Sequence, residues 1–288
     1  MDTGQHRLPA KLRESPELKT GRQRFCRARL SSGALLTAFL SIALLPVRVQ
    51  AQETRAANPS LEGLPSAETI LAKYVEAVGG RAAIEKFKSR ISRGTIELPA
   101  MNVSGTIEVF EKAPNKALAV IDLSYLGIYR QGFDGATGWT EDPQNGLREV
   151  EGAARAAAER DADFYWPLRL ARLYAQLIVR ARLVLDGREA WVVEAVPAEG
   201  AAEKLFFDVE SGLLVRKDTE RELAEGKVQV ENYFEDYREF DGLRLPTTIR
   251  EWNPLYSYTM KITAVEQNPP IEDSRFRKPE AEPRKPNP

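Results

Sequence analysis

Three acidic residues are the side chains of this sequence best suited to chemistry. Asp134 stands in an Asp-Gly pair, and Glu141 and Asp142 stand directly before Pro143. Two carboxylates at a suitable separation act as acid and base on a glycosidic bond. Asp-Gly and Asp-Pro are also common turn-forming pairs, and we predict that these residues form turns. A carboxylate-based hydrolase is kept as an alternative function, and no catalytic residue is assigned.

The sequence contains one histidine, His6, and one cysteine, Cys26. If residues 1–51 are removed, the remaining chain can form no disulfide, no thiol nucleophile and no Ser-His-Asp arrangement. Metal sites built from His or Cys are excluded in the same way, although oxygen-ligand metals are not. We therefore predict a binding or carrier protein with no metal and no cofactor, and not an enzyme.

The N-terminus has the pattern of an export signal. Eight basic side chains lie within the first thirty residues, a mostly apolar stretch follows over 33–47, and Val49-Gln50-Ala51 has the form of a cleavage site. The apolar stretch is shorter than the roughly 17 to 25 residues that a membrane-spanning helix needs. We predict a signal peptide over 1–51, cleaved after Ala51, and a periplasmic protein. An uncleaved N-terminal anchor is the alternative.

The rest of the chain is predicted to form one domain. After residue 51 it holds 39 acidic and 32 basic residues, a balance that argues against nucleic acid as a partner. Residues 52–65 are polar and are expected to be a flexible lead-in, whereas 269–288 hold six prolines among many charges and are expected to be a disordered tail. The domain between them, 66–268, is expected to be a monomer.

This domain is predicted to be mainly β with a few helices. Apolar residues at helical spacing predict a helix over 66–78, with Ser66 as its N-cap, and a short second helix over 81–87. Ala-rich and Leu/Arg-rich stretches predict two further helices, over 153–162 and 167–175. Strands are predicted at 90–98, 103–112, 116–124, 127–133, 137–141, 177–185, 189–197, 203–209, 212–220, 227–240, 243–252 and 257–266.

The connections between these strands are short, so consecutive strands must pair antiparallel. The expected fold is therefore a meander of ten or more strands, which must curl because open sheets seldom exceed about ten strands. The helices are expected to cover its concave face. The charged run 220–225, which includes Arg221, is predicted to be a solvated hairpin tip.

Several predicted strands are apolar on both faces, for example 189–197, where Trp191 and Val193 alternate with Ala190 and Val192. Such strands are either packed on both sides or line an apolar cavity. The aromatic stretch that begins at Phe164 interrupts the strands like a lid. Residues predicted to line a cavity or its lid are Trp139, Phe164, Trp166, Leu170, Leu173, Trp191 and Phe206. Ordinary core packing is the alternative for each of them.

The late segments Leu205-Phe206-Phe207-Asp208-Val209-Glu210-Ser211-Gly212-Leu213 and Phe240-Asp241-Gly242-Leu243-Arg244-Leu245-Pro246 resemble recurrent hairpins of the LolA/LolB-like lipoprotein-carrier superfamily. With the order of helices and strands, the resemblance spans about 66–267. It implies an unclosed, LolA-like half-barrel with helices over an apolar cavity that holds acyl chains. The partners it implies are lipid or lipoprotein acyl chains and another envelope protein, and an envelope scaffold with a filled barrel is the alternative.

Overall fold

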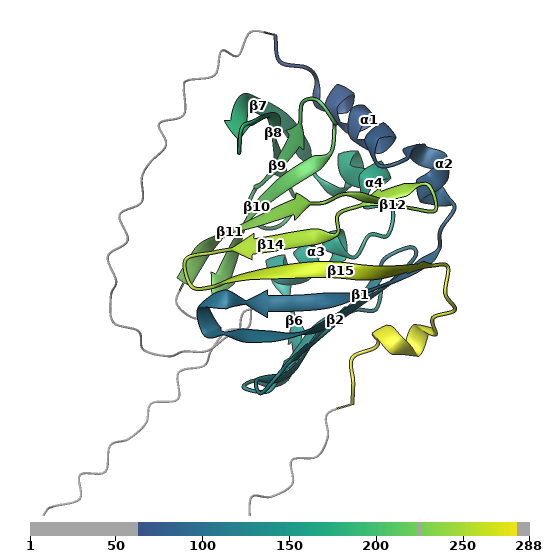
Figure 1. Cartoon of the computed structure of the whole chain (residues 1–288), viewed down its shortest axis with the longest axis vertical. Coiled ribbons are helices and arrows are strands. Elements are labelled where there is room, and N and C mark those ends of the chain that lie inside the picture. Colours follow the sequence, from purple (N-terminus) through teal and green to yellow (C-terminus); the bar gives the residue numbers. More distant parts are fainter. Residues whose placement is uncertain (1–62, 224–225, 281–288) are drawn as a thin grey trace, which may run out of the picture. The chain divides into compact units, whose positions relative to one another are not determined.

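The structure is a computed structural model of the chain, and it describes residues 63–223 and 226–280. The predicted signal peptide and most of the predicted lead-in lie outside these residues. The described chain is dominated by a single antiparallel sheet of 13 strands that does not close on itself. Figure 1 shows this sheet bending around the helices on one of its faces. The predicted fold class, an unclosed and mainly β domain with a few helices, is confirmed.

The sheet runs in the order β6-β5-β4-β3-β2-β1-β15-β14-β11-β10-β9-β8-β7. Its strands are β1 (Ser89–Leu98), β2 (Val103–Lys112), β3 (Lys116–Leu123), β4 (Gly127–Phe133), β5 (Gly138–Asp142), β6 (Gly146–Val150), β7 (Gln176–Leu185), β8 (Arg188–Val196), β9 (Glu203–Asp208), β10 (Leu214–Leu223), β11 (Gly226–Glu235), β14 (Thr248–Trp252) and β15 (Ser257–Gln267). A separate hairpin pairs β12 (Arg238–Phe240) with β13 (Leu243–Leu245).

The strands do not form one continuous meander, which corrects the sequence-based prediction. The chain starts at the centre of the sheet with β1 and steps outward to the edge strand β6. It then crosses to the opposite edge through two helices, α3 (Gly152–Asp161) and α4 (Trp166–Leu173), and returns inward from β7 to β15. The last strand, β15, pairs with the first, β1, so two meanders meet in the middle of the sheet.

The predicted N-terminal helix is observed as α1 (Ala67–Ala77). The side chain of Ser66 accepts a hydrogen bond from the Thr69 backbone N–H, as expected of an N-cap. The chain leaves the helix at Gly79, whose φ of 121° is a backbone conformation that glycine adopts easily and other residues rarely do. A Cβ atom at Gly79 would also lie 2.2 Å from the carbonyl oxygen of Gly242. The second helix, α2 (Gly80–Glu85), follows directly.

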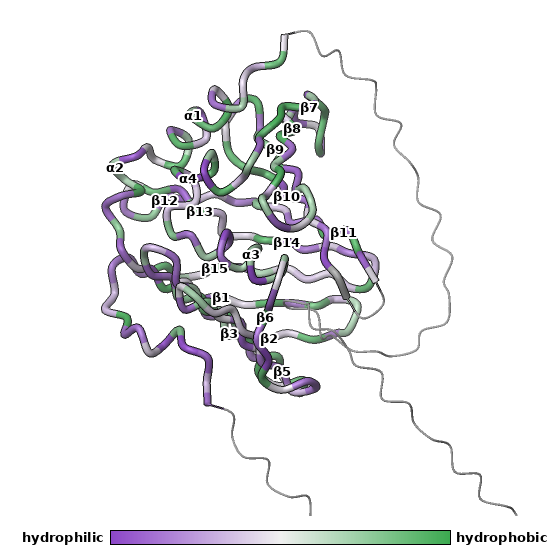
Figure 2. The backbone as a smooth tube through the Cα atoms, turned by 180° about the vertical axis from the view of Figure 1, so that it is seen from behind, coloured by the Kyte–Doolittle hydropathy of each residue, from purple (hydrophilic) through white to green (hydrophobic). Residues whose placement is uncertain are grey.

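The two faces of the sheet have different covers. One face, which we call the helix face, packs against α1, α2 and α4. Its core there consists of Ile70, Leu71, Tyr74, Val78, Ile84, Phe87, Phe164, Leu170, Tyr174, Val193, Ala195, Leu205, Phe207, Leu214 and Leu243. Hydrophobic and hydrophilic residues are interleaved along α1 and along the strands (Figure 2), so each element has one side to bury.

The opposite face, which we call the outer face, carries the end of the chain. A short 3-10 helix, η2 (Asp273–Phe276), lies against it, and Phe276 is fully buried. Together with Ile271 it packs on the strand residues Ile91, Phe110 and Leu118. The prediction of a disordered tail is therefore wrong for residues 269–280, because its two apolar side chains find a matching strip of sheet. Residues 281–288 lie outside the described part of the chain.

Two predicted strands are each divided in the structure. The predicted strand over 227–240 breaks at Asp236, whose φ of 52° is incompatible with a strand. The predicted strand over 243–252 breaks around Thr247, whose backbone N–H and hydroxyl both bond to the carbonyl of Asp236. These breaks produce the β12–β13 hairpin. The edge strand β6, in contrast, was not predicted at all.

Candidate functional site: the apolar helix face

The helix α4 is the element that the sequence predicted as a lid. The carboxylate of Asp163 accepts from the Tyr165 backbone N–H at 2.9 Å and pairs with Arg169 at 3.0 Å, which fixes the first turn. Pro167 stands in the first turn, where its missing N–H costs nothing. From this start, the apolar side of α4 points at the sheet, and Leu170 is only 1 % exposed.

The structure brings five of the seven predicted cavity or lid residues into one apolar cluster. They are Phe164, Trp166, Leu170, Leu173 and Trp191, from α4, the segment before it and β8. The cluster also joins α4 to α1, because Tyr74 of α1 lies edge-on to Trp166 with ring centroids 6.2 Å apart. On its other side Tyr74 packs against Phe207 of β9 at 5.3 Å. The helices and the sheet thus share a continuous aromatic contact.

Two predicted cavity residues, Trp139 and Phe206, lie elsewhere. Trp139 belongs to the outer-face core, where its indole N–H donates to the carbonyl of Phe276 at 2.9 Å. Phe206 alternates with the inward-facing Phe207 and packs instead with Val192 under the guanidinium of Arg216, which is 5.0 Å from its ring centroid. Strand alternation separates these two residues from the helix-face cluster, so neither lies in it.

A buried group of charges borders the apolar cluster beneath α3. Glu203 of β9 accepts from Arg160 at 2.8 Å and from the Tyr174 hydroxyl at 2.6 Å. Lys217 of β10 lies 3.1 Å from Glu203 and 2.8 Å from Asp161. Burial alone would raise the pKa of Glu203, but the Lys217 charge and these hydrogen bonds lower it. The pairs tie α3 to two strands that are far from it in sequence.

A second buried pair lies on β10 and β14. Arg221 donates to both carboxylate oxygens of Glu251, at 3.0 and 3.2 Å. The hydroxyls of Tyr256 and Tyr258 donate to the same carboxylate at 3.2 and 2.9 Å. Arg221 was predicted to lie on a solvated hairpin tip, which is wrong: its side chain is mostly buried. The sequence showed only a local run of charges, because the partner is thirty residues away.

The three carboxylates that opened the sequence argument serve other purposes. Asp134 accepts from the backbone N–H groups of Ala136 and Thr137 within its own turn. Glu141 pairs with Arg130 on the neighbouring strand at 2.7 Å. Asp142 caps the β5–β6 turn through Gln144 and Asn145. Asp134 and Asp142 stand at opposite ends of β5, and the consecutive strand residues Glu141 and Asp142 point to opposite faces of the sheet, so these carboxylates do not form an acid–base pair.

Two general properties of the described residues bear on binding. Nowhere in 63–223 or 226–280 do three or more His, Cys, Asp or Glu side chains gather in a way that would hold a metal ion. Within the same ranges, no helix has both the length and the apolar character required to cross a membrane.

The architecture defines the class of this protein: an open antiparallel half-barrel whose inner face is covered by helices. Solved structures of this architecture include a DUF1329 family protein from Desulfovibrio piger (12% identity, 73% of this chain and 96% of that chain, TM-score 0.52). A domain from Vibrio parahaemolyticus, assigned by its name to outer membrane lipoprotein sorting, is 13% identical over 74% and 98% of the two chains, with a TM-score of 0.51.

A LolA superfamily protein from Nitrosomonas europaea is 15% identical over 75% of this chain and 99% of that chain, with a TM-score of 0.49. The likeness to the Desulfovibrio piger and Vibrio parahaemolyticus structures shows that this chain shares their fold. No protein-family model matches the sequence. No curated protein is similar enough to match it either. At identities this low, the structural likeness establishes the fold alone.

Proposed function

We propose that this protein is a periplasmic, non-enzymatic carrier that holds the acyl part of a lipid or lipoprotein between the helix face of the sheet and the helices α1 and α4. The observation that carries the proposal is the apolar cluster that joins Trp166, Leu170 and Tyr74 to the sheet. An acyl chain gains about 0.8 kcal/mol per CH₂ on leaving water, so a face of this kind is a suitable place for it.

The space under the helices is filled by side chains in this structure, since Val193, Leu205 and Phe207 are fully buried. Cargo can therefore enter only if a helix moves. The helix α3 is tied to the sheet by the Arg160–Glu203 and Asp161–Lys217 pairs. In contrast, α4 meets the sheet through apolar side chains such as Leu170. Replacing these apolar contacts by an acyl chain conserves apolar burial, so we propose that α4 moves while α3 stays in place.

The test is mass spectrometry of an organic extract of the natively purified protein, combined with uptake of a fluorescent long-chain fatty acid. We expect bound lipid in the extract and saturable uptake of the probe. Replacing Trp166 by alanine removes an aromatic contact between α4 and α1, and should change the rate of uptake at least several-fold. Trp252→Ala is the matched control, because Trp252 is 49 % exposed and lies outside the cluster.

A second candidate function is favoured by the filled interior itself. If the helices never leave the sheet, the domain is an envelope interaction module that binds another protein through its surface. It then yields no lipid and takes up no fatty acid, with or without Trp166. If no lipid is found, no fatty acid is taken up, and a protein copurifies specifically with the chain, the interaction module is the correct function.

A further inference from the structure

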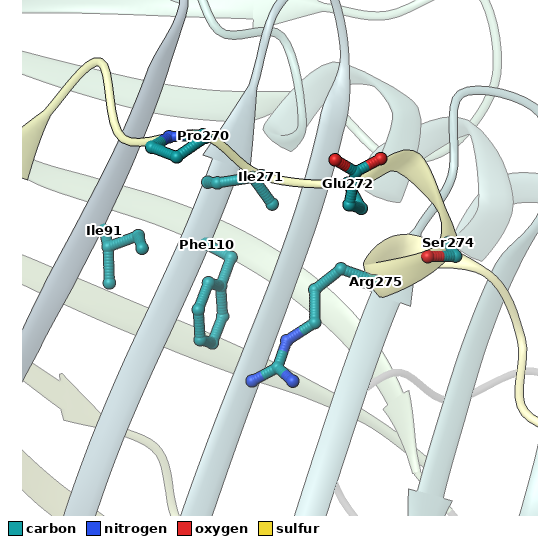
Figure 3. Close-up of a pocket in the computed structure, with 7 residues that line it drawn as sticks. All are labelled: Ile91, Phe110, Pro270, Ile271, Glu272, Ser274 and Arg275. Atoms are coloured by element: carbon teal, nitrogen blue, oxygen red, sulfur yellow. The ribbon is translucent and has the colours of Figure 1, made fainter.

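A separate pocket of about 300 Å³ lies on the outer face, where the C-terminal segment crosses β1 and β2. Ile91 and Phe110 line it from the strands, and Pro270, Ile271, Glu272, Ser274 and Arg275 line it from the segment (Figure 3). This volume is at the lower end of the range for small-molecule sites, and the lining combines apolar and charged groups as such sites do. The helix-face cluster shares none of these residues.

The segment that completes this pocket is held in a defined position. Lys112 donates to the Ile271 carbonyl at 2.6 Å, and Asp273 pairs with Lys112 at 2.8 Å and with Lys116 at 2.7 Å. The buried ring of Phe276 anchors the far end. The pocket therefore has a fixed wall and needs no large rearrangement to form.

Arg275 is the polar group that gives the pocket its chemistry. Its guanidinium carbon lies 4.4 Å from the centroid of the Phe110 ring, which orients the planar group. Among residues 63–223 and 226–280, no carboxylate pairs with this guanidinium, whereas Asp273 pairs with both Lys112 and Lys116 nearby. Figure 3 shows the Glu272 carboxylate pointing the opposite way. An oriented, unpaired guanidinium beside apolar side chains favours an amphipathic anion.

We propose that this pocket binds one carboxylate carried on a short apolar body, as in a medium-chain fatty acid. The carboxylate pairs with Arg275, and the apolar body contacts Ile91, Phe110 and Ile271. A ligand with two negative charges is disfavoured, because Arg275 is the one cation among the lining residues and Glu272 belongs to the same wall. The site lies on the outer face, so it is additional to the proposed carrier function and does not depend on it.

Because the ligand contacts both the strands and the segment, its binding also stabilises the docked segment. Saturation with ligand should therefore slow cleavage within residues 269–280 by an added protease. This readout is independent of the affinity measurement and reports on the same site.

In the experiment, octanoate is added stepwise to the full chain, and NMR records the signals of the isoleucine methyl groups. We expect the methyl signals of Ile91 and Ile271 to shift, and Arg275→Gln to weaken octanoate binding at least tenfold. Arg277→Gln is the matched control, since Arg277 is exposed two residues further on and does not line the pocket. Octanamide, which has the same body without the charge, should bind weakly to the wild type and be unaffected by Arg275→Gln.

Shifts at Ile70 and Ile84, which belong to the helix-face cluster, without shifts at Ile91 and Ile271, would overturn this proposal while supporting the carrier function. Equal octanoate affinity in wild type and Arg275→Gln would overturn it as well, as would the absence of any shift. Failure of the carrier function is recognised separately, by the lack of lipid and of long-chain uptake. Unchanged tryptophan fluorescence in Arg275→Gln, to which the buried Trp139 contributes, confirms that the segment is still docked.

Discussion

The buried carboxylate of Glu251, only 3 % exposed, depends on a single cation. Arg221 supplies two hydrogen bonds in the bidentate geometry that makes such pairs strong. Burial alone would lower the pKa of Arg221, but the charge and hydrogen bonds of Glu251, together with Tyr256 and Tyr258, raise it overall. Arg221 is therefore charged in the folded protein. Removing one partner of such a buried pair costs more stability than the intact pair contributes.

We predict that Arg221→Met lowers the free energy of unfolding by about 3 kcal/mol, because the carboxylate of Glu251 is then buried without its cation. Urea unfolding followed by circular dichroism measures the change. The double variant Arg221→Met, Glu251→Leu should recover most of this loss, since it removes the uncompensated charge.

The control for this prediction is Arg81→Met, which breaks the exposed pair with Glu85 on one turn of helix. Such surface pairs contribute at most about 0.5 kcal/mol. If Arg221→Met were as mild as Arg81→Met, the Arg221–Glu251 pair would have no role in stability.

At the residue scale, sequence reasoning succeeded where the signal was local. The turn roles of Asp134 and Asp142 followed from their neighbours in the chain, and the structure confirms them. It failed where the partner is distant: the Arg221–Glu251 pair requires the register of β10, β11 and β14, and Trp139 meets Phe276 across 137 positions. No local pattern contains that information.

At the scale of elements, the C-terminal segment is the piece whose attachment is easiest to isolate. Phe276 is fully buried against the outer face, and the indole of Trp139 bonds to its carbonyl. We predict that Phe276→Ala releases the segment and lowers the free energy of unfolding by about 3 kcal/mol, the low end for a buried phenylalanine. Acrylamide quenching of tryptophan fluorescence should increase as Trp139 becomes accessible.

Arg277→Ala is the appropriate comparison, because its side chain is exposed and it follows Phe276 directly. It should leave both stability and quenching close to those of the wild type. Unchanged quenching in Phe276→Ala would mean that the segment is held by its polar contacts alone.

The helices and strands were predicted well where hydrophobic periodicity was clear. They were predicted poorly where a single backbone angle or a distant contact determines the local structure. Helix α1 and most strands follow their apolar patterns. The break at Asp236 depends on a left-handed backbone conformation. Residues other than Gly, Asn and Asp rarely adopt it, and an Asp in the sequence does not by itself show that it does. The segment after Pro269 has the composition of a disordered tail, and its order depends on contacts with distant strands, among them the packing of Ile271 and Phe276 on the sheet.

At the scale of the whole molecule, the pairing of β1 with β15 joins two meanders into one sheet. Gly94 makes this joint possible, because a Cβ atom there would lie 2.0 Å from the carbonyl oxygen of Lys261. We predict that Gly94→Ala lowers the free energy of unfolding by about 3 kcal/mol, the upper end for overpacking, since the obstacle is backbone. Urea unfolding measures the effect, and limited proteolysis locates the loosened strands.

Thr95→Ala tests the same strand without that clash. Thr95 is exposed, and its side chain points to the other face from its neighbour. Its replacement should cost about 1 kcal/mol or less. A Gly94→Ala variant as stable as Thr95→Ala would show that β15 can shift to accept a side chain.

The fold class could be predicted from the sequence because short connections force neighbouring strands to pair antiparallel. The order of the strands could not, because the two helices α3 and α4 carry the chain from one edge of the sheet to the other. Nothing in the residues 90–97 identifies 259–267 as their partner. The helix-face cluster could be predicted only in part. Its residues in and next to α4 are close together in the sequence, whereas its strand residues depend on which face each strand buries.

The central β1–β15 pairing also determines the order in which the sheet can form during folding. Strand β1 is synthesised before the other strands of the sheet, and one of its two edges has no partner until β15, the last strand within the described residues, has emerged. Contacts this far apart in sequence form slowly, because a long loop must close before they contribute. Until then each meander exposes an unpaired central edge, and such edges invite association with other chains. A chaperone that binds β1 during this interval would protect the protein at its most vulnerable stage.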